Sequence, residues 1–190
     1  MKKLVLALCL LMGMAAQSQM DERLTYLLDT ERSLINWRGY YAFKFSEHKG
    51  TVNFRSGELR TDGGAIVGGS FVIDMNSISN RDYLEGNGPV EHLKDEDFFF
   101  VKKFPFALLE IETVEYFPEE NKHKFIATLT IKGVSNQQEF WGVADGDALE
   151  LRTQFKIDRT RWGITYNNDL KDHAIAEAIE FDVYLKFKAQ

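Results

Sequence analysis

The sequence predicts an all-β protein, an eight-stranded antiparallel barrel. Apolar and polar residues alternate with a period of two in eight stretches, which is typical of strands with one buried and one solvated face. Most neighbouring stretches are joined by short segments rich in Gly, Asn and Asp, as antiparallel hairpins are. Eight one-sided strands joined in this way can close into an up-and-down barrel, which leaves no exposed sheet edge.

The N-terminal residues 1–18 have the three parts of a secretory signal. A pair of lysines precedes an apolar run from Leu4 to Met14, and small residues up to Ser18 follow it. The run is too short to cross a bilayer. We therefore expect cleavage after Ser18, a single mature domain over residues 19–190, and a periplasmic or otherwise secreted location.

Composition excludes several classes of function. Cys9 is the only cysteine and lies in the predicted signal, so the mature chain has no thiol for a disulfide, an iron–sulfur cluster or a cysteine nucleophile. Removing Lys2 and Lys3 from the 23 basic residues leaves 21 against 29 acidic ones, a formal charge of −8. Such a surface repels phosphate polymers, so we expect no nucleic-acid partner.

The first three strands are expected before residue 76. Leu34–Phe45 contains Trp37 and a cluster of Tyr and Phe, and Thr51–Arg60 alternates apolar with polar residues. Ala65–Met75 alternates too and is flanked and interrupted by glycine pairs at 63/64 and 68/69. No Lys-Ser/Thr follows these glycines, so we interpret them as bends of a strand around a barrel corner rather than a phosphate loop.

A long connection separates the third stretch from the fourth. It has about thirty residues, far more than a hairpin needs, and is therefore expected to be either functional or disordered; its composition favours order. Pro89 favours the start of a helix, and Pro105 ends a second short helical stretch in which Phe98 and Phe99 share one side. We expect a helical insertion over about residues 77–105 that folds across an open end of the barrel and buries its phenylalanines.

Five more strands are expected after the insertion. Their connections are short turns such as Asp145–Asp147, a hairpin signal with Gly at its centre. Alternation is cleanest in the last two, in which Phe155 and Phe181 fall on the apolar side. The five stretches are Phe106–Tyr116, Phe125–Ile131, Gln137–Val143, Leu149–Asp158 and Glu180–Lys188.

The sequence carries no catalytic or metal-binding pattern. Its four histidines fall in separate elements without HxxxH or HxH spacing, and it has no nucleophile motif, Walker motif or dinucleotide fingerprint. We therefore expect no catalytic residue, no metal site and no cofactor. The chain instead supplies 15 Phe, 7 Tyr and 3 Trp, which either fill a barrel interior or line it around a slender ligand.

Five blocks of sequence together resemble the YceI family of small secreted lipid-binding proteins. In chain order they are SEHKGTV (46–52), FVIDMNSI (71–78), EHLKDEDFFFVKKFP (91–105), FIATLTIKGVSNQQEF (125–140) and FKIDRTRWGI (155–164). The resemblance implies a lipocalin-like barrel whose elongated cavity holds an isoprenoid chain, with the helical insertion near its opening. The chain departs from the family at Phe100, where many relatives have a small acidic residue.

The leading hypothesis is a non-catalytic carrier that buries an isoprenoid or similar lipid tail. A neutral head such as a quinone is favoured, because a diphosphate would need a cationic patch, for which Lys102, Lys103, Arg159 and Arg161 are the candidates. A homodimer and a transient contact with a membrane or a membrane protein are left open. Nine apolar residues are expected to contact the ligand: Trp37, Phe71, Phe98, Phe99, Leu129, Phe140, Phe155, Ile157 and Phe181.

Two other classes of function are left open. An enzyme acting on a lipid would use His48 or His92 as its base, and a carboxylate or hydroxyl group would converge on that histidine inside the cavity. An interaction module would dock through the aromatic insertion and leave its three consecutive phenylalanines, residues 98–100, exposed. The carrier hypothesis instead expects at least two of them to be buried.

Overall fold

A computed structural model describes residues 23–41, 47–80, 89–166 and 175–188. No helix in this part of the chain has the length and apolar character needed to span a bilayer. Several features of the sequence lie outside the described residues: the predicted signal with Cys9, the aromatic residues Phe43 and Phe45, the predicted helix start at Asn87 and Gly88, and His173.

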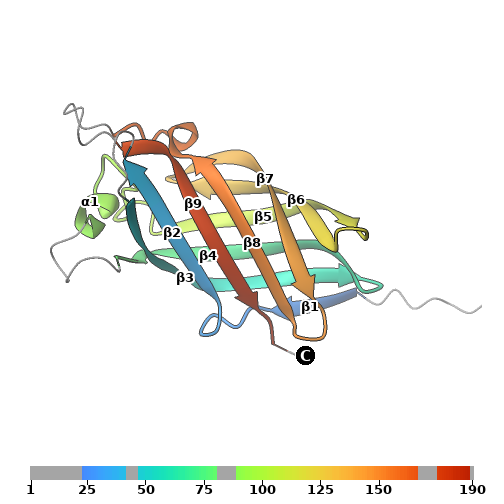
Figure 1. Ribbon diagram of the computed structural model, residues 1–190. Helices are drawn as coiled ribbons and strands as arrows, with labels where there is room; N and C mark the ends of the chain where they lie inside the picture. The colour runs from blue at the N-terminus through green and yellow to red at the C-terminus, as the bar shows by residue number, and fades with distance from the viewer. Residues whose placement is uncertain (1–22, 42–46, 81–88, 167–174, 189–190) are drawn as a thin grey trace, which may run out of the picture.

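The strands form one antiparallel sheet that closes on itself as an eight-stranded barrel, as predicted (Figure 1). Both β1 and β2 pair with β3, and β4 pairs with β3 along the opposite edge to complete the ring. Because β1 and β2 pair with different parts of β3, they occupy one position in the barrel. The strands are β1 (Arg23–Leu27), β2 (Leu34–Tyr41), β3 (Glu47–Asp62), β4 (Ala65–Asn80), β5 (Phe106–Phe117), β6 (Lys122–Ile131), β7 (Val134–Asp145), β8 (Glu150–Asp158) and β9 (Ile175–Lys186).

Strand β1 was not expected from the sequence. It has only five residues, of which Leu24 and Leu27 are exposed and Tyr26 packs against the core, so the alternation is too short to stand out. The turn between β3 and β4 also differs from expectation. Gly63 and Gly64 both have positive φ and form a two-residue hairpin turn, rather than a bend within a strand.

The seam between β7 and β8 is short. The two strands, both wholly described, pair only where residues 142–145 meet residues 150–153. Beyond that point side chains reach main-chain carbonyls across the seam: Gln138 Nε2 donates to Lys156 O (3.4 Å), and Arg161 Nη2 donates to Gln137 O (3.0 Å). Side-chain hydrogen bonds thus substitute for part of the ladder.

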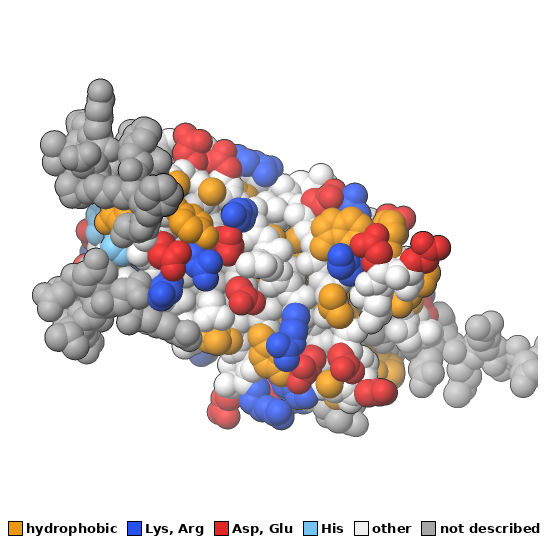
Figure 2. Space-filling view, in the orientation of Figure 1, with side chains coloured by type: hydrophobic (Ala, Val, Ile, Leu, Met, Phe, Trp, Pro, Cys, Tyr) orange, Lys and Arg blue, Asp and Glu red, His pale blue; other side chains and the backbone are white. Residues whose placement is uncertain are grey.

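The outer wall formed by β2, β8 and β9 is polar and mixed in charge (Figure 2). Glu180 is the centre of its largest network, because its carboxylate lies 3.0 Å from Lys156 Nζ and 3.5 Å from Arg38 Nη1. It also accepts hydrogen bonds from Gln154 (3.0 Å) and Tyr40 (3.3 Å). The hydrogen bond from Lys156 is the main reason that the pKa of Glu180 is lowered.

The insertion begins later and is less helical than expected. Because β4 continues to Asn80, the connection is residues 81–105, and its only described helix is the single turn α1 (Val90–Lys94), directly after Pro89. The second predicted helical stretch is instead a series of turns. Phe100 adopts a positive φ of 47°, which a continuous right-handed helix cannot contain.

Candidate ligand cavity

The barrel encloses a cavity of about 180 Å³ that is walled by inward side chains of β2 to β9. Almost all the lining side chains are apolar, and none of the described lining residues is an Asp or Glu. The interior is therefore partly hollow and apolar rather than packed throughout.

Four consecutive phenylalanine rings form an aromatic belt across the inner wall. Phe125 lies opposite Phe140 in the β6–β7 register, and Phe155 lies opposite Phe181 in the β8–β9 register. Their ring centroids are separated by 5.2 Å (Phe125–Phe140), 5.1 Å (Phe140–Phe155) and 5.5 Å (Phe155–Phe181). Trp37 pairs with Phe181 in the β2–β9 register and extends the belt. Alternation places all five residues on the inner face.

Trp37 crosses β3 to reach β4. Its indole Nε1 donates a hydrogen bond to the carbonyl oxygen of Ser79 (3.1 Å). Gly50 lies between them: a Cβ at this position would lie 1.7 Å from Ser79 O and 2.8 Å from the Trp37 ring. Because the first of these atoms belongs to the backbone, only glycine fits there without a shift of the strands.

The insertion closes one end of the cavity with buried rings. Phe98 and Phe99 are 2% and 9% exposed, line the cavity and form an edge-to-face pair with centroids 4.8 Å apart. Tyr166, which follows β8, packs against His92 of α1 with ring centroids 4.2 Å apart. Phe100 is only partly buried. Two of the three consecutive phenylalanines are therefore buried, as the carrier hypothesis requires.

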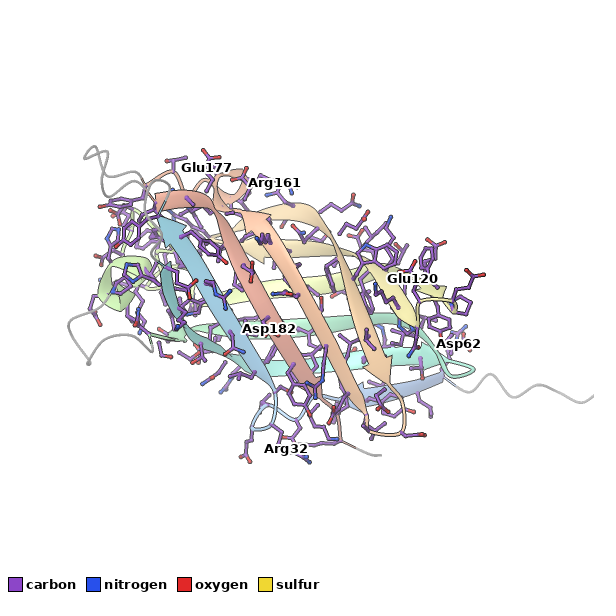
Figure 3. The ribbon with its side chains drawn as sticks, viewed as in Figure 1. Arg32, Asp62, Glu120, Arg161, Glu177 and Asp182 are labelled. Carbon is purple, nitrogen blue, oxygen red and sulfur yellow. The ribbon has the colours of Figure 1, made fainter. Side chains whose placement is uncertain are left out.

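Arg159 supplies the one formal charge among the described lining residues. It lies in the 3-10 helix η1 (Arg159–Trp162) and is 2% exposed, and its guanidinium donates to the carbonyl oxygens of Ala176 (3.2 Å), Ile175 (3.2 Å) and Ile164. Burial lowers its pKa, and the charge of Glu177, which Figure 3 labels near the start of β9, opposes this shift. It has no ion pair with a carboxylate in the described part of the chain. Its hydrogen bonds hold η1 against the start of β9.

The local structure around η1 explains how Arg159 is positioned. The Asp158 carboxylate accepts hydrogen bonds from Thr160 N (2.9 Å) and Thr160 Oγ1 (2.6 Å), which caps the helix and lowers the pKa of Asp158. Trp162 is fully buried and donates to the carbonyl of Leu129 (2.9 Å). Gly163, at φ +70°, ends the helix. The turn is thus fixed at both ends and pinned to β6.

The cationic patch considered from the sequence does not assemble at the cavity. Of its four candidates only Arg159 lines the cavity. Arg161 reaches the β7 main chain, and Lys102 and Lys103 are exposed on the outer side of the insertion.

Two histidines line the cavity. His48 Nε2 lies 2.7 Å from the hydroxyl of Tyr41, and His92 Nδ1 lies 3.8 Å from a carboxylate oxygen of Asp97. A histidine beside a hydroxyl group is what the enzyme alternative requires, so this alternative stays open. His92, Asp95 and Asp97 also bring potential metal-ligand atoms within 4.8 Å of one another, but both carboxylates are exposed, as surface acids commonly are.

Eight of the nine residues expected to contact a ligand line the cavity: Trp37, Phe71, Phe98, Phe99, Leu129, Phe140, Phe155 and Phe181. Ile157 is buried, at 2% exposure, but is not among the lining residues. Contact with a ligand remains a prediction for the group. Other lining residues were not predicted. Phe125 and Val183 share the inward parity of Leu129 and Phe181, so counting every second residue along β6 and β9 would have found them. Phe54 lies on β3, where no contact residue was predicted.

Comparisons with known proteins agree with this fold and point to one family. The profile of the YceI-like domain matches residues 26–187. Among curated protein sequences none matches the chain significantly.

Solved structures have the same fold at low sequence identity. BcnA of Burkholderia cenocepacia is similar with a TM-score of 0.68 and 18% identity, covering 83% of this chain and 98% of its own. A polyisoprenoid binding domain from Saccharophagus degradans gives a TM-score of 0.60 and 16% identity, over 87% and 98%. The YceI protein of Campylobacter jejuni gives 0.55 and 20%, over 80% and 91%. Because the profile match covers most of the chain and the solved structures share its fold, the chain belongs to the YceI-like family.

Proposed function

We propose that this protein is a non-catalytic carrier that works outside the cytoplasm and buries the tail of an isoprenoid or similar lipid in its barrel. The observation that carries the proposal is the hollow interior, walled by apolar side chains from eight strands and the insertion. Its family membership supports a lipid ligand, as does its likeness to a domain described as polyisoprenoid binding.

The energetics suit a tail that binds without polar contacts. At about 0.8 kcal/mol per buried carbon, one five-carbon isoprene unit gains about 4 kcal/mol on leaving water in the ideal limit. Immobilising the chain and its partners offsets much of this gain. A few units then suffice for roughly micromolar binding, which corresponds to about 8 kcal/mol.

The cavity favours a neutral head group. Arg159 is the one cation among the described lining residues, and three main-chain carbonyls already accept its hydrogen bonds. A diphosphate would bring several negative charges to this single, largely satisfied guanidinium. A quinone head carries no charge and needs no such partner.

Native mass spectrometry of protein purified from its own host, followed by organic extraction, tests the proposal. We expect a bound mass that the extract identifies as a prenyl lipid. A clean mass of the protein alone, together with no uptake of added quinone or prenyl phosphate, contradicts it.

The enzyme alternative predicts turnover that depends on the Tyr41–His48 pair. Incubating the protein with the extracted lipid distinguishes the two functions. The carrier returns the lipid unchanged, whereas an enzyme yields a product whose rate of formation falls in a His48→Gln variant.

A further inference from the structure

A patch of exposed and partly exposed apolar side chains lies on the outer surface beside the insertion. Strand β5 leads away from the insertion (Figure 1). Phe106 and Leu108, at its start, are 44% and 46% exposed and so lie on its outer face. Phe104 covers the β6–β7 turn, because its ring lies 2.7 Å from where a Cβ on Gly133 would be. The rings of Phe100 and Phe104 are 6.1 Å apart. We call Phe100, Phe104, Phe106 and Leu108 the rim patch.

The backbone at Phe100 is held in a conformation that directs its ring to this patch. Its φ of 47° is in the left-handed region, which residues with a β-carbon disfavour. Its N–H donates to Asp95 O (2.8 Å), and its carbonyl accepts from Lys103 N (3.0 Å) and Phe104 N (2.9 Å). These hydrogen bonds fix a strained residue, so that Phe100 packs on Phe104 while its two preceding neighbours are buried.

Three lysines accompany the rim patch. Lys103 Nζ lies 5.9 Å from the centroid of Phe100 and 5.2 Å from that of Phe104, and Lys102 is exposed beside it. Lys132, in the turn that Phe104 covers, donates to the main-chain carbonyl of Glu96 (2.9 Å). None of the three forms an ion pair with a carboxylate in the described ranges, unlike Lys124 or Lys156 on the barrel wall. Their charges are therefore available to an external partner.

We propose that the rim patch is the surface by which the protein docks on a lipid bilayer. This inference rests on the proposed function, because a bilayer is where an apolar tail resides before the protein takes it up. Aromatic rings flanked by lysines suit the interface between headgroups and acyl chains, where the rings enter and the ammonium groups meet lipid phosphates. The chain as a whole is acidic, so this attraction is local to the patch.

Other occupants fit the patch less well. A symmetric dimer centred on this face would bring the lysines of both copies into one interface, and their like charges would repel. An extended peptide cannot add to β5, because β4 and β6 pair with its two edges. A bilayer needs neither a self-complementary charge pattern nor a free strand edge.

Cosedimentation with phosphatidylcholine vesicles, with and without phosphatidylglycerol, tests the proposal. The mature protein is compared with a Phe106→Thr/Leu108→Thr variant, which keeps strand-forming residues on β5. The matched control is Val67→Thr/Val143→Thr, because both valines are also exposed on strands, at 48% and 43%. Uptake of a prenol delivered by cyclodextrin is measured in parallel, since it needs no membrane.

We expect the rim variant to bind vesicles at least tenfold more weakly than the wild type and the valine variant, with prenol uptake unchanged. Lys102→Gln and Lys103→Gln are expected to weaken binding to the anionic vesicles alone, by roughly fivefold each. Equal vesicle binding by all the variants, or no binding by the wild type, overturns docking. So does a concentration-dependent dimer that only the rim variant loses. Absence of prenol uptake by every protein overturns the carrier function instead, and vesicle binding remains measurable.

Discussion

Replacing Phe155 by alanine tests whether the inward faces of the strands surround a usable hollow. Phe155 stacks on Phe140 at 5.1 Å and on Phe181 at 5.5 Å, and it lines the cavity. Each aromatic pair contributes about 0.5–1.5 kcal/mol beyond burial. Burial of a large apolar side chain contributes about 1.5–3 kcal/mol. Since one side of the ring already borders a cavity, we expect the free energy of unfolding to fall by about 3 kcal/mol, the low end for Phe→Ala in a core.

Urea unfolding followed by circular dichroism measures this loss. With a slope of about 1–3 kcal/mol per molar urea, the midpoint should fall by about 1 M or more. A prenol added at about a hundred times its dissociation constant should raise the free energy of unfolding of the wild type by about 2.7 kcal/mol. The variant should gain at least as much, because the truncation enlarges an apolar cavity and leaves its other walls in place.

The control for this experiment is Lys156→Gln, on the outer face of the same strand. Lys156 is 61% exposed and its ion pair with Glu180 is worth at most about 1 kcal/mol. An aspartate at this position is a poor control, since it would face the Glu180 carboxylate. If Phe155→Ala lowers the free energy of unfolding no more than Lys156→Gln does, Phe155 does not face the interior of the barrel. If the prenol stabilises neither protein, the hollow does not serve a lipid tail.

Three further changes test the local structure. Glu180→Gln should lower the free energy of unfolding by about 1–2 kcal/mol at neutral pH. Because the pKa of Glu180 is depressed in the folded state, this difference from the wild type should vanish as the pH falls through that pKa. Urea titrations that show a constant difference down to acid pH contradict this. Gly50→Ala should cost on the order of 3 kcal/mol, as its Cβ would meet Ser79 O, and should change Trp37 fluorescence; an unchanged melting temperature and spectrum count against the close approach. Arg159→Lys should lower the free energy of unfolding by roughly 2–4 kcal/mol although the charge is kept, because the three N–H donors of an ammonium diverge from one nitrogen and cannot reach the carbonyls that Nε, Nη1 and Nη2 of Arg159 contact; a thermal melt like that of the wild type contradicts this role.

Alternation predicted the barrel well because each long strand has one face inside. The number of positions in the ring and the inward parity of Phe140, Phe155 and Phe181 follow from it. Alternation did not predict the strand segments that depend on pairing with a neighbouring strand rather than on a periodic sequence. Strand β1 needs only an edge of β3 to pair with, and β4 continues five residues beyond its predicted end at Met75 because β3 extends beside it.

The candidate site was predictable in kind but not in extent. Ile157 has the same parity as Phe155 yet lies outside the cavity, since inward orientation does not decide where packing is complete. Arg159 shows the opposite limit. Its role depends on hydrogen bonds to the carbonyls of Ile164, Ile175 and Ala176. These residues come later in the chain than η1 and pack against it only in the folded protein, so no local sequence pattern predicts the contacts.

The short pairing of β7 with β8 marks the place where the barrel wall is expected to open most easily. Hydrogen bonds from Gln138 and Arg161 close the rest of that seam, and a side chain can release a carbonyl without unzipping its neighbours. Those amide protons of residues 137–141 that face β8, rather than the β6 ladder, should then exchange with deuterium sooner than the paired amides of the β3–β4 hairpin. If the barrel takes up a lipid tail as proposed, its wall would part first along this line, because longer ladders join the other neighbouring strands.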